Sequence, residues 1–302
     1  MGVLNNDRVG NTSEGEREDF VLSIICSKPG STQAKITRLV EEWLKRHELE
    51  LLAKSRSFTV AIANVWIPDC RKEEILTDFK RQRGEWYEQH GCDVNICSSS
   101  LGKAIRAKND QVMFIFDMDS TLIQMECIDE LARMAGIAER ISKITRDAMN
   151  GLYDFSESLC LRLALLKGLK VDWSLLQQKA VLALTSGARD LAKFLKAHNV
   201  KTAIVSGGFS PIADHLCSIL DFDKCFANTL ETVDDKLTGC LLGDCIDAEG
   251  KARILRDLAR GKFSRVVAVG DGANDLKMIA EASPYGVAFC AKPIVAHQVL
   301  ML

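Results

Sequence analysis

Asp117 and Asp119 stand directly after the apolar run VMFIF, which is typical of a buried strand. In an extended backbone, residues two apart point to the same side, so both carboxylates would face one site. Two close carboxylates repel each other and raise one of their pKa values. A divalent cation such as Mg²⁺, which prefers oxygen ligands, relieves that repulsion. The alternative is a pair of acids that caps the following helix.

A second acidic segment, GDGAND (270–275), follows another apolar run and favours the metal site over the helix cap. Asp271 and Asp275 are four residues apart, in a loop and in the first turn of the next helix. Gly270 and Gly272 would let the backbone approach a ligand closely. The segment is similar to half of a dinucleotide-binding fingerprint, but Asp275 occupies the position of the third glycine. Acids at the ends of two strands therefore predict a metal site.

Two further segments are suited to binding an anion. Ser206 and Gly207 begin the sequence SGG, which ends an apolar run from residue 201 and would offer a hydroxyl and free backbone N–H groups. The segment is not a G-x-S-x-G elbow, because Ile204 fills the first glycine position. Lys251, in the helical sequence KARILRDLAR, would bring a positive charge to a phosphate. The alternative for SGG is a plain strand–helix turn, and, taken alone, a lysine at this position is usually solvated.

The composition limits the classes of function. Of the 302 residues, 47% are apolar and 26% are charged, as in an ordinary globular protein with a core. The 39 basic and 41 acidic residues give a net charge of −2, so we expect no nucleic-acid partner and no anionic membrane partner. No apolar run is long enough to span a membrane. The 11 cysteines are scattered and include no C-x-x-C pair, which predicts buried free thiols in a reducing cytoplasm.

The elements that must position these residues differ between the two halves of the chain. We expect a disordered tail over 1–18, an α+β ferredoxin-like unit of order β-α-β-β-α-β over 19–98, and a polar linker over 99–110. From 111 to 302, continuous apolar strands alternate with helices, which predicts an α/β Rossmann-like core with a parallel sheet. Residues 126–185 contain helical patterns and no strand signal, so we expect a helical cap inserted there.

Four motifs in a fixed order resemble those of the haloacid dehalogenase superfamily of phosphotransferases: DMDST (117–121), SGG (206–208), the helix-borne lysine and GDGAND (270–275). The sequences MECIDELARMAG, TRDAMNGLYDFSESLCLRLALLKG and VSGGFSPIADHL narrow the resemblance to the phosphoserine phosphatase family. The similarity extends from residue 111 to 293. It implies hydrolysis of O-phospho-L-serine to L-serine and phosphate, the last step of serine biosynthesis, by a cytoplasmic enzyme with Mg²⁺ as its cofactor.

The resemblance also implies a role for each acid. Asp117 is similar to the nucleophile of the family, which forms an aspartyl-phosphate. Asp119 is similar to the general acid, which protonates the leaving serine oxygen and then activates water. Mg²⁺ would be held by Asp117, by the backbone carbonyl of Asp119 and by Asp271, with Asp275 supporting the site.

Contacts with the substrate are implied in the same way. The resemblance assigns them in the core to Ser206, Gly207, Lys251 and Asn274. In the cap, Glu126 matches the residue that takes the ammonium group and Arg162 the one that takes the carboxylate, for which a planar guanidinium is suited. Without the family, these two would be an ordinary helix-start glutamate and a surface arginine. Met149 and Phe155 would form an apolar wall of the cap that excludes water.

Several alternatives and departures remain open at this stage. The N-terminal unit resembles an ACT-like domain in architecture only, and we favour a dimerising scaffold, with a homodimer through this unit, over an amino-acid sensor. Rival functions are a phosphatase for another small phosphomonoester and an inactive amino-acid-sensing regulatory protein. Gly250 replaces an aromatic residue beside the motif lysine, which predicts a looser helix start. The chain ends before the last strand and helix of the family, which predicts an uncovered sheet edge and reduced stability.

Overall fold

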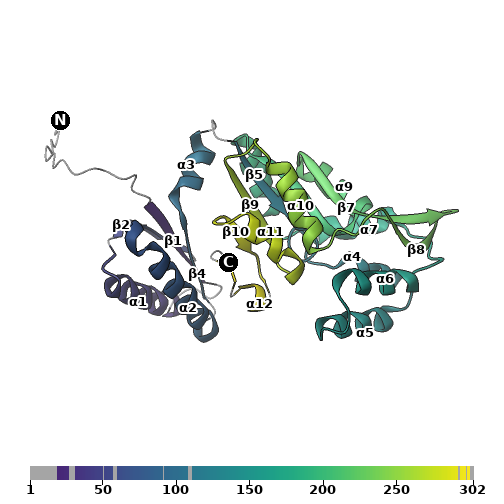
Figure 1. Cartoon of the computed structure of the whole chain (residues 1–302), viewed down its shortest axis with the longest axis horizontal. Helices are drawn as coiled ribbons and strands as arrows, with labels where there is room; N and C mark the ends of the chain where they lie inside the picture. The colour runs from purple at the N-terminus through teal and green to yellow at the C-terminus, as the bar shows by residue number, and fades with distance from the viewer. Residues whose placement is uncertain are drawn as a thin grey trace.

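The structure, a computed structural model, forms two units joined by a short helix (Figure 1). It describes residues 19–26, 31–49, 51–56, 60–90, 92–107, 111–291, 293–296 and 298–299. The predicted tail, residues 1–18, lies outside the described residues. Among the described helices, none has both the length and the apolar character that crossing a membrane requires.

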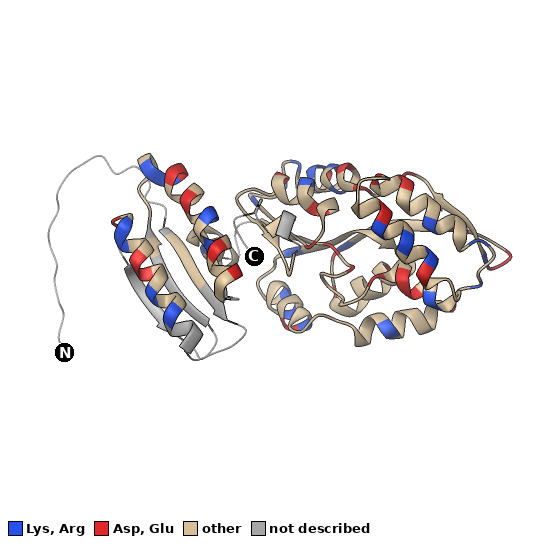
Figure 2. Ribbon diagram, turned by 90° about the horizontal axis from the view of Figure 1, so that it is seen from below, with Lys and Arg blue, Asp and Glu red and all other residues tan. Residues whose placement is uncertain are grey.

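The N-terminal unit has the predicted order of elements. These are β1 (Asp19–Cys26), α1 (Ser31–Arg46), β2 (Leu51–Arg56), β3 (Val60–Trp66), a 3-10 turn η1 (Asp69–Arg71), α2 (Lys72–His90) and β4 (Cys92–Ser98). Its antiparallel sheet has the strand order β2-β3-β1-β4. Both helices pack on one face of this sheet and lie in front of it in Figure 2. The buried rings of Trp43, Phe79 and Trp86 meet edge to face between the two helices.

Residues 99–107 form a helix, α3 (Ser99–Ala107), where the polar composition predicted a linker. Only one face of this helix is apolar, and it buries Ala104 and Ile105. At its start, the N–H of Ser100 donates to Ser98 Oγ at 3.1 Å, which supports the first turn. The segment thus joins the two units as a short amphipathic helix, which its low average hydrophobicity did not indicate.

Three polar contacts connect the units within the part of the chain that the structure describes. The hydroxyls of Ser100 and Tyr285 lie 2.8 Å apart. Arg83, which is buried on α2, donates to the carbonyl oxygen of Ala296 at 2.7 Å and to that of Val299. The N-terminal unit is thus attached to the C-terminal part of the second unit.

The second unit is built on a six-stranded sheet of order β10-β9-β5-β6-β7-β8. Its strands are β5 (Val112–Phe116), β6 (Lys201–Phe209), β7 (Lys224–Val233), β8 (Lys236–Leu242), β9 (Arg265–Gly270) and β10 (Gly286–Ala288). All neighbours are parallel, as predicted, except β7 and β8, which form a hairpin at the edge that we did not predict. Its two-residue turn places Asp234 and Asp235 at φ 49° and 61°. Such turns are usually recognised by a glycine, which is missing here.

Helices cover both faces of this sheet, since neighbouring residues of each strand point to opposite sides. They are α8 (Ala188–Ala197), α9 (Ser210–Leu220), α10 (Ala248–Ala259), the 3-10 turn η2 (Ala273–Asp275), α11 (Leu276–Glu281) and α12 (Pro293–Ala296). Ile115 and Val205 pack in one apolar cluster with α10 and α11, whereas Phe116 and Ile204 pack in a second cluster with α9. The α/β core is therefore confirmed.

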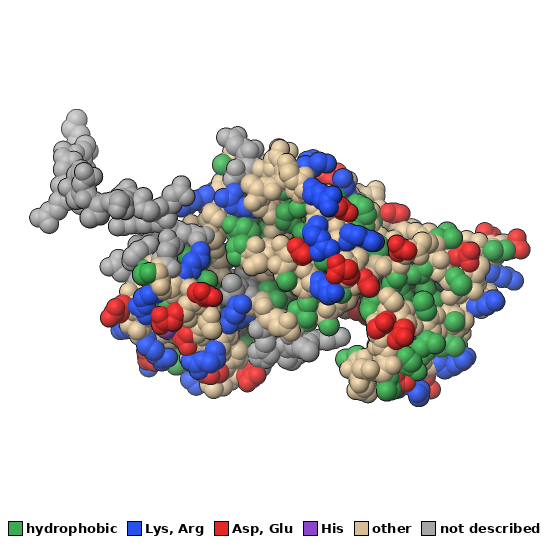
Figure 3. All heavy atoms as spheres, in the orientation of Figure 1, with side chains coloured by type: hydrophobic (Ala, Val, Ile, Leu, Met, Phe, Trp, Pro, Cys, Tyr) green, Lys and Arg blue, Asp and Glu red, His purple; other side chains and the backbone are tan. Residues whose placement is uncertain are grey.

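A helical cap is inserted between β5 and α8. It consists of α4 (Cys127–Met134), α5 (Ala138–Met149), α6 (Phe155–Leu165) and α7 (Trp173–Leu182). Leu131, Ile141, Leu159 and Leu163 are buried in it and belong to the same apolar cluster as one face of the sheet. Hydrophobic side chains also gather on the surface of the cap, at the lower right of Figure 3.

Charge and cysteine placement also bear on the sequence predictions. On the face drawn in Figure 3, basic and acidic side chains intermix. Nine cysteines in the described part of the chain are free thiols. Their predicted burial was mostly wrong: of these nine, Cys127 is buried, whereas Cys160 and Cys290 are among the exposed ones.

Candidate active site

Three neighbouring strands end at one edge of the sheet and carry polar side chains there. β5 lies between β6 and β9. Asp117 follows β5, Ser206 lies in the last part of β6, and Asp271 follows β9. The N–H of Asp117 donates to the carbonyl oxygen of Val269 at 2.8 Å, so the β5–β9 ladder continues into the site. The carboxyl ends of parallel strands thus bring together residues that are distant in the sequence.

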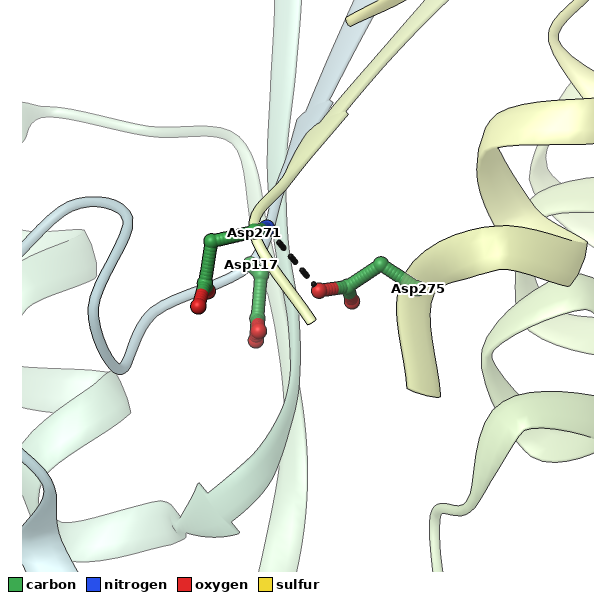
Figure 4. A group of neighbouring side chains, drawn as sticks. All are labelled: Asp117, Asp271 and Asp275. Carbon is green, nitrogen blue, oxygen red and sulfur yellow. Dashed lines mark hydrogen bonds between the residues drawn. The ribbon is translucent and has the colours of Figure 1, made fainter. Parts of the chain in front are cut away.

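Asp117, Asp271 and Asp275 form a compact group of carboxylates. One oxygen of each lies within 4.8 Å of the others. In Figure 4, Asp117 and Asp271 extend side by side from the strand ends, and Asp275 approaches from the helix that follows. The hydroxyl of Thr121 donates to Asp271 Oδ1 at 3.2 Å, which fixes one oxygen of that carboxylate.

Both oxygens of Asp275 are occupied by protein donors. Asp275 Oδ2 accepts the main-chain N–H groups of Asp271 at 3.1 Å and of Gly272 at 3.0 Å. Asp275 Oδ1 accepts a hydrogen bond from Lys251 Nζ at 2.6 Å. A Cβ atom at position 270 would lie 2.4 Å from Asp275 Cγ, so Gly270 is required for this approach. Asp275 therefore holds the loop that carries Asp271, which favours a supporting position for it.

Lys251 is fully buried beneath the site. Its Nζ lies 2.8 Å from Asp117 Oδ1 and 2.6 Å from Asp275 Oδ1. Burial lowers the pKa of Lys251, but the attraction of the two carboxylates outweighs burial and raises the pKa above its usual value. The helix start that we expected to be loosened by Gly250 is held by an N-cap, because Asp247 Oδ1 accepts the N–H of Gly250 at 2.8 Å.

The site has more negative charge than the protein neutralises. Burial, followed by repulsion from Asp275, raises the pKa of Asp117 well above its usual range, although Lys251 opposes the shift. Burial and the same repulsion raise the pKa of Asp271 to about 6. A hard divalent cation beside Asp117 and Asp271 would remove this repulsion, and their oxygen donors are of the type that Mg²⁺ prefers. The residues present therefore fit a cation of this class.

Asp119 lies two residues beyond Asp117 and carries a titratable carboxyl into the same site. Its Oδ1 accepts the N–H of Cys127 at 3.3 Å. Burial, with a further contribution from the charge of Glu126, raises the pKa of Asp119 to about 7. A carboxyl with this pKa can both donate and accept a proton near neutral pH.

The two glycines after Ser206 are required by close contacts. A Cβ atom on Gly207 would lie 2.8 Å from the ring of Phe155, and one on Gly208 would lie 2.6 Å from Asp119 Oδ2. The hydroxyl of Ser206 is buried and accepts the N–H of Gly208 at 2.9 Å. The segment therefore brings the cap, the core and the loop that carries Asp119 into contact around a largely buried stretch of backbone.

Asn228 on β7 is a positioning residue that the sequence analysis missed. Its Nδ2 donates to the carbonyl oxygen of Gly207 at 2.9 Å, and its Oδ1 accepts the N–H of Ile246 at 2.8 Å. Asn228 is buried and thus ties β6 to the loop that precedes α10 and Lys251. An asparagine inside a strand was the available signal, since a buried amide in a sheet must find partners.

A cavity of about 510 Å³ lies between the cap and the edge of the sheet. Ten of the twelve residues predicted for the site line it: Asp117, Asp119, Glu126, Met149, Phe155, Arg162, Ser206, Gly207, Asp271 and Asn274. Lys251 and Asp275 are buried beneath it. Four polar side chains that the sequence analysis did not select also line the cavity, namely Asp129, Thr145, Tyr153 and Ser158. Its volume suits a small molecule.

The cap contributes two charged groups to the lining of this cavity. Arg162 lies on α6, whose start is fixed by a capping box between Asp154 and Glu157. Its Nε donates to the carbonyl oxygen of Ser158 at 3.1 Å. Glu126 precedes α4 and accepts a hydrogen bond from the hydroxyl of Ser120 at 2.7 Å. A carboxylate and a guanidinium of the cap thus line the same cavity as the carboxylates of the core, and Glu126 is close enough to contribute to the raised pKa of Asp119.

Comparison with known proteins agrees with this geometry. The model of the haloacid dehalogenase-like hydrolase family matches residues 113–283. The chain is 41% identical to a phosphoserine phosphatase of Haemophilus influenzae over 225 residues, which are 72% of this chain and 70% of that protein. It is 46% identical to a phosphoserine phosphatase of Archaeoglobus fulgidus over 185 residues, 60% of this chain, and spans about half of that protein's length (53%).

Solved structures extend the comparison. A HAD family hydrolase of Salmonella enterica serovar Typhi superimposes with a TM-score of 0.76 at 29% identity, over 93% of each chain. A phospho-aspartyl intermediate analogue of phosphoserine phosphatase superimposes with a TM-score of 0.55 at 38% identity, over 64% of this chain and 93% of that one. The family model covers more than half of this sequence, and the Haemophilus protein is matched over more than two thirds of its length. The chain therefore belongs to the haloacid dehalogenase-like hydrolases and, within them, to the phosphoserine phosphatase family.

Proposed function

We propose that this chain is a Mg²⁺-dependent phosphatase that hydrolyses O-phospho-L-serine to L-serine and phosphate, in the last step of serine biosynthesis. The observation that carries the proposal is the cavity itself. Carboxylates and the Gly207 backbone line it from the core, and a carboxylate and a guanidinium line it from the cap. Phosphoserine has a phosphate at one end and an ammonium and a carboxylate at the other, so its charges complement both walls.

The first displacement would start at Asp117. One of its oxygens attacks phosphorus and forms an aspartyl-phosphate, while the bond from phosphorus to the serine oxygen breaks. Protonated Asp119 gives its proton to that oxygen, and L-serine leaves. The pKa of about 7 for Asp119 supports this proton transfer near neutral pH.

The second displacement would reverse the proton transfer. Asp119, now ionised, takes a proton from a water molecule whose oxygen attacks the same phosphorus. The bond from phosphorus to Asp117 breaks, phosphate leaves, and Asp117 is regenerated as a carboxylate. Ser206, the N–H of Gly207 and Lys251 would hold the phosphoryl oxygens in both steps.

Metal binding is assigned to the same edge of the sheet. Asp117, the backbone carbonyl of Asp119 and Asp271 would hold Mg²⁺, and Asp275 would support them from beneath. The ion would neutralise charge on the phosphoryl group. The group of three carboxylates supports this assignment.

Selection of the substrate would take place in the cap. Glu126 would take the ammonium group and Arg162 the carboxylate, and Asn274 would contact the substrate from the core. Met149 and Phe155, which line the same cavity, would cover the substrate and exclude water.

For the N-terminal unit we propose an ACT-like domain over residues 19–98 that serves as a dimerising scaffold. Its β-α-β-β-α-β order and strand order β2-β3-β1-β4 support the assignment. The phosphatase core would comprise residues 111–302, with a cap inserted at about 126–185. A cytoplasmic location is supported by nine free thiols in the described part of the chain.

Phosphate release tests the proposed reaction. The full chain is incubated with L-phosphoserine, phosphothreonine or p-nitrophenyl phosphate, each with Mg²⁺ and again with EDTA. We expect release that requires Mg²⁺ and is fastest with L-phosphoserine. Metal-dependent release without this preference would indicate a phosphatase for another phosphomonoester, and no release from any of them by a folded chain would reject the enzyme.

A further inference from the structure

The cap wall of the cavity carries one acid that has no role in the proposed reaction. The charged side chains of this wall are Glu126, Asp129 and Arg162. Glu126 and Arg162 together complement an ammonium and a carboxylate, so a zwitterionic substrate leaves this pair balanced. Asp129 is then an additional negative charge in a site that already holds several carboxylates, and its position requires an explanation.

Helix geometry places Asp129 beside Glu126, on the cavity wall that also carries Arg162. It lies in the first turn of α4, three residues after Glu126, so both side chains lie on one side of that helix. Asp129 is half-buried and lines the cavity. The next residue, Glu130, does not line the cavity and instead pairs with Lys179 at 2.8 Å and with Arg133. The two neighbouring acids therefore face different surroundings.

Arg162 needs a counter-charge of its own. Its Nε is fixed by the carbonyl oxygen of Ser158, and among the described residues no carboxylate forms an ion pair with it within 4.0 Å. Burial lowers the pKa of Arg162, whereas the charges of Glu126 and Asp129 oppose that effect. Once Glu126 pairs with the ammonium group of a substrate, its charge is no longer available to Arg162, and Asp129 is the acid that remains.

We infer that Asp129 is a positioning residue whose negative charge, on the same cavity wall, orients the Arg162 guanidinium toward the substrate carboxylate, which leaves Glu126 free to bind the ammonium group. The inference rests on the proposed function. It gives the two cap acids different roles, because Glu126 contacts the substrate whereas Asp129 acts through Arg162. The simpler role of Asp129, stabilising the positive end of α4, is one that Glu130 shares.

The test compares four phosphate monoesters that offer different end groups to the cap, and each variant is compared with wild type on the same substrate. L-Phosphoserine has an ammonium and a carboxylate, O-phosphoethanolamine has the ammonium only, 3-phosphooxypropionate has the carboxylate only, and p-nitrophenyl phosphate has neither. Steady-state kinetics are measured for wild type, Asp129→Asn, Asp129→Glu and the matched control Glu130→Gln. The control removes one charge from the same helical turn without changing the cavity.

We expect Asp129→Asn to lower kcat/KM by about tenfold or more for the two substrates with a carboxylate, mainly through KM, as for a lost interaction with a charged group. The other two substrates should change by less than about twofold, and Glu130→Gln should leave all four unchanged. Asp129→Glu, which keeps the charge, should recover part of the loss. In an Arg162→Ala background, Asp129→Asn should have no further effect.

Other outcomes overturn the inference. An equal loss with all four substrates would mean a structural role, and a loss that follows the ammonium group would mean that Asp129 contacts it directly. A loss that persists in the Arg162→Ala background would mean that Asp129 does not act through Arg162.

A failure of the proposed function would be seen separately: the wild-type protein would then show no higher kcat/KM for L-phosphoserine than for p-nitrophenyl phosphate. In that case the ¹⁵N NMR signal of the Arg162 Nε–H group tests the role of Asp129 without an activity assay. The signal should shift and exchange faster with water in Asp129→Asn than in Glu130→Gln, and an identical signal in the two variants would reject the role of Asp129.

Discussion

Replacing Lys251 by methionine tests the electrostatic basis of the site, because a buried cation is exchanged for an apolar side chain of similar length. Lys251 Nζ lies 2.8 Å from Asp117 and 2.6 Å from Asp275, and the lysine is fully buried. Removing one partner of a buried charge pair costs about 3–5 kcal/mol, since the remaining charge has no compensation. In a unit of this size, each kcal/mol shifts the melting temperature by about 2–4 °C, so we expect a decrease of about 6–20 °C.

The pH dependence of this loss has a defined sign. The pKa of Asp117 is already raised by burial, and Lys251 is the group that opposes the shift. Without Lys251 the folded protein holds a proton on Asp117 that the unfolded chain releases above about pH 4. Stability of the variant should therefore fall as the pH rises above 4, and its deficit relative to wild type should shrink as the pH is lowered.

Thermal unfolding by circular dichroism, in EDTA and from pH 4 to 8, measures both effects. Lys277→Met is the matched control, because Lys277 is exposed and its pair with Glu249 at 3.2 Å should contribute less than about 1 kcal/mol. Saturating Mg²⁺ should narrow the gap between Lys251→Met and wild type, since the ion supplies positive charge at the same carboxylates. A metal-free variant that melts within about 2 °C of wild type would refute the reasoning.

Three further predictions concern other parts of the molecule. Asp117→Asn should abolish phosphate release while the circular dichroism spectrum stays unchanged, and a wild-type rate would exclude Asp117 as the nucleophile. Asn228→Ala should lower the free energy of unfolding by roughly 1–3 kcal/mol for each of the two main-chain groups left unpaired, and should reduce kcat; denaturant titration and phosphate release measure the two losses. Asp78 has a pKa of about 2, because hydrogen bonds from Arg81, His47 and Trp43 outweigh its burial, so its stabilisation is complete above pH 4 and is lost as the pH falls towards 2. Asp78→Asn should therefore melt at a lower temperature than wild type at pH 7 but not at pH 2, and equal melting temperatures at pH 7 would contradict this.

Much of the site was predictable because it depends on local patterns. Asp117, Ser206 and Asp271 each follow or end an apolar run, and parallel strands place such ends at one edge. The order of helices between β5 and α8 likewise predicted an inserted cap. The resemblance to the family then selected Glu126 and Arg162, whose types and positions alone would not distinguish them from surface residues.

The remaining features depend on contacts between distant segments. The pairing of Lys251 with Asp117 and Asp275 joins residues from three elements, and no spacing in the sequence specifies those distances. Asn228 was missed for the same reason, since its partners are main-chain groups of Gly207 and Ile246. The β7–β8 hairpin was missed because its turn lacks a glycine.

Trapping the intermediate tests the central claim most directly. The full chain is mixed with L-phosphoserine and Mg²⁺, quenched in acid within milliseconds, digested, and analysed by mass spectrometry. Asp119→Asn is treated in parallel, because an aspartyl-phosphate that forms more slowly in this variant should also be hydrolysed more slowly. The account predicts one phosphoryl group on the peptide that contains Asp117, located on Asp117 itself, and none in Asp117→Asn. Efficient turnover of phosphoserine with the phosphoryl group on another residue, or with no phosphorylated peptide in either protein, would contradict it.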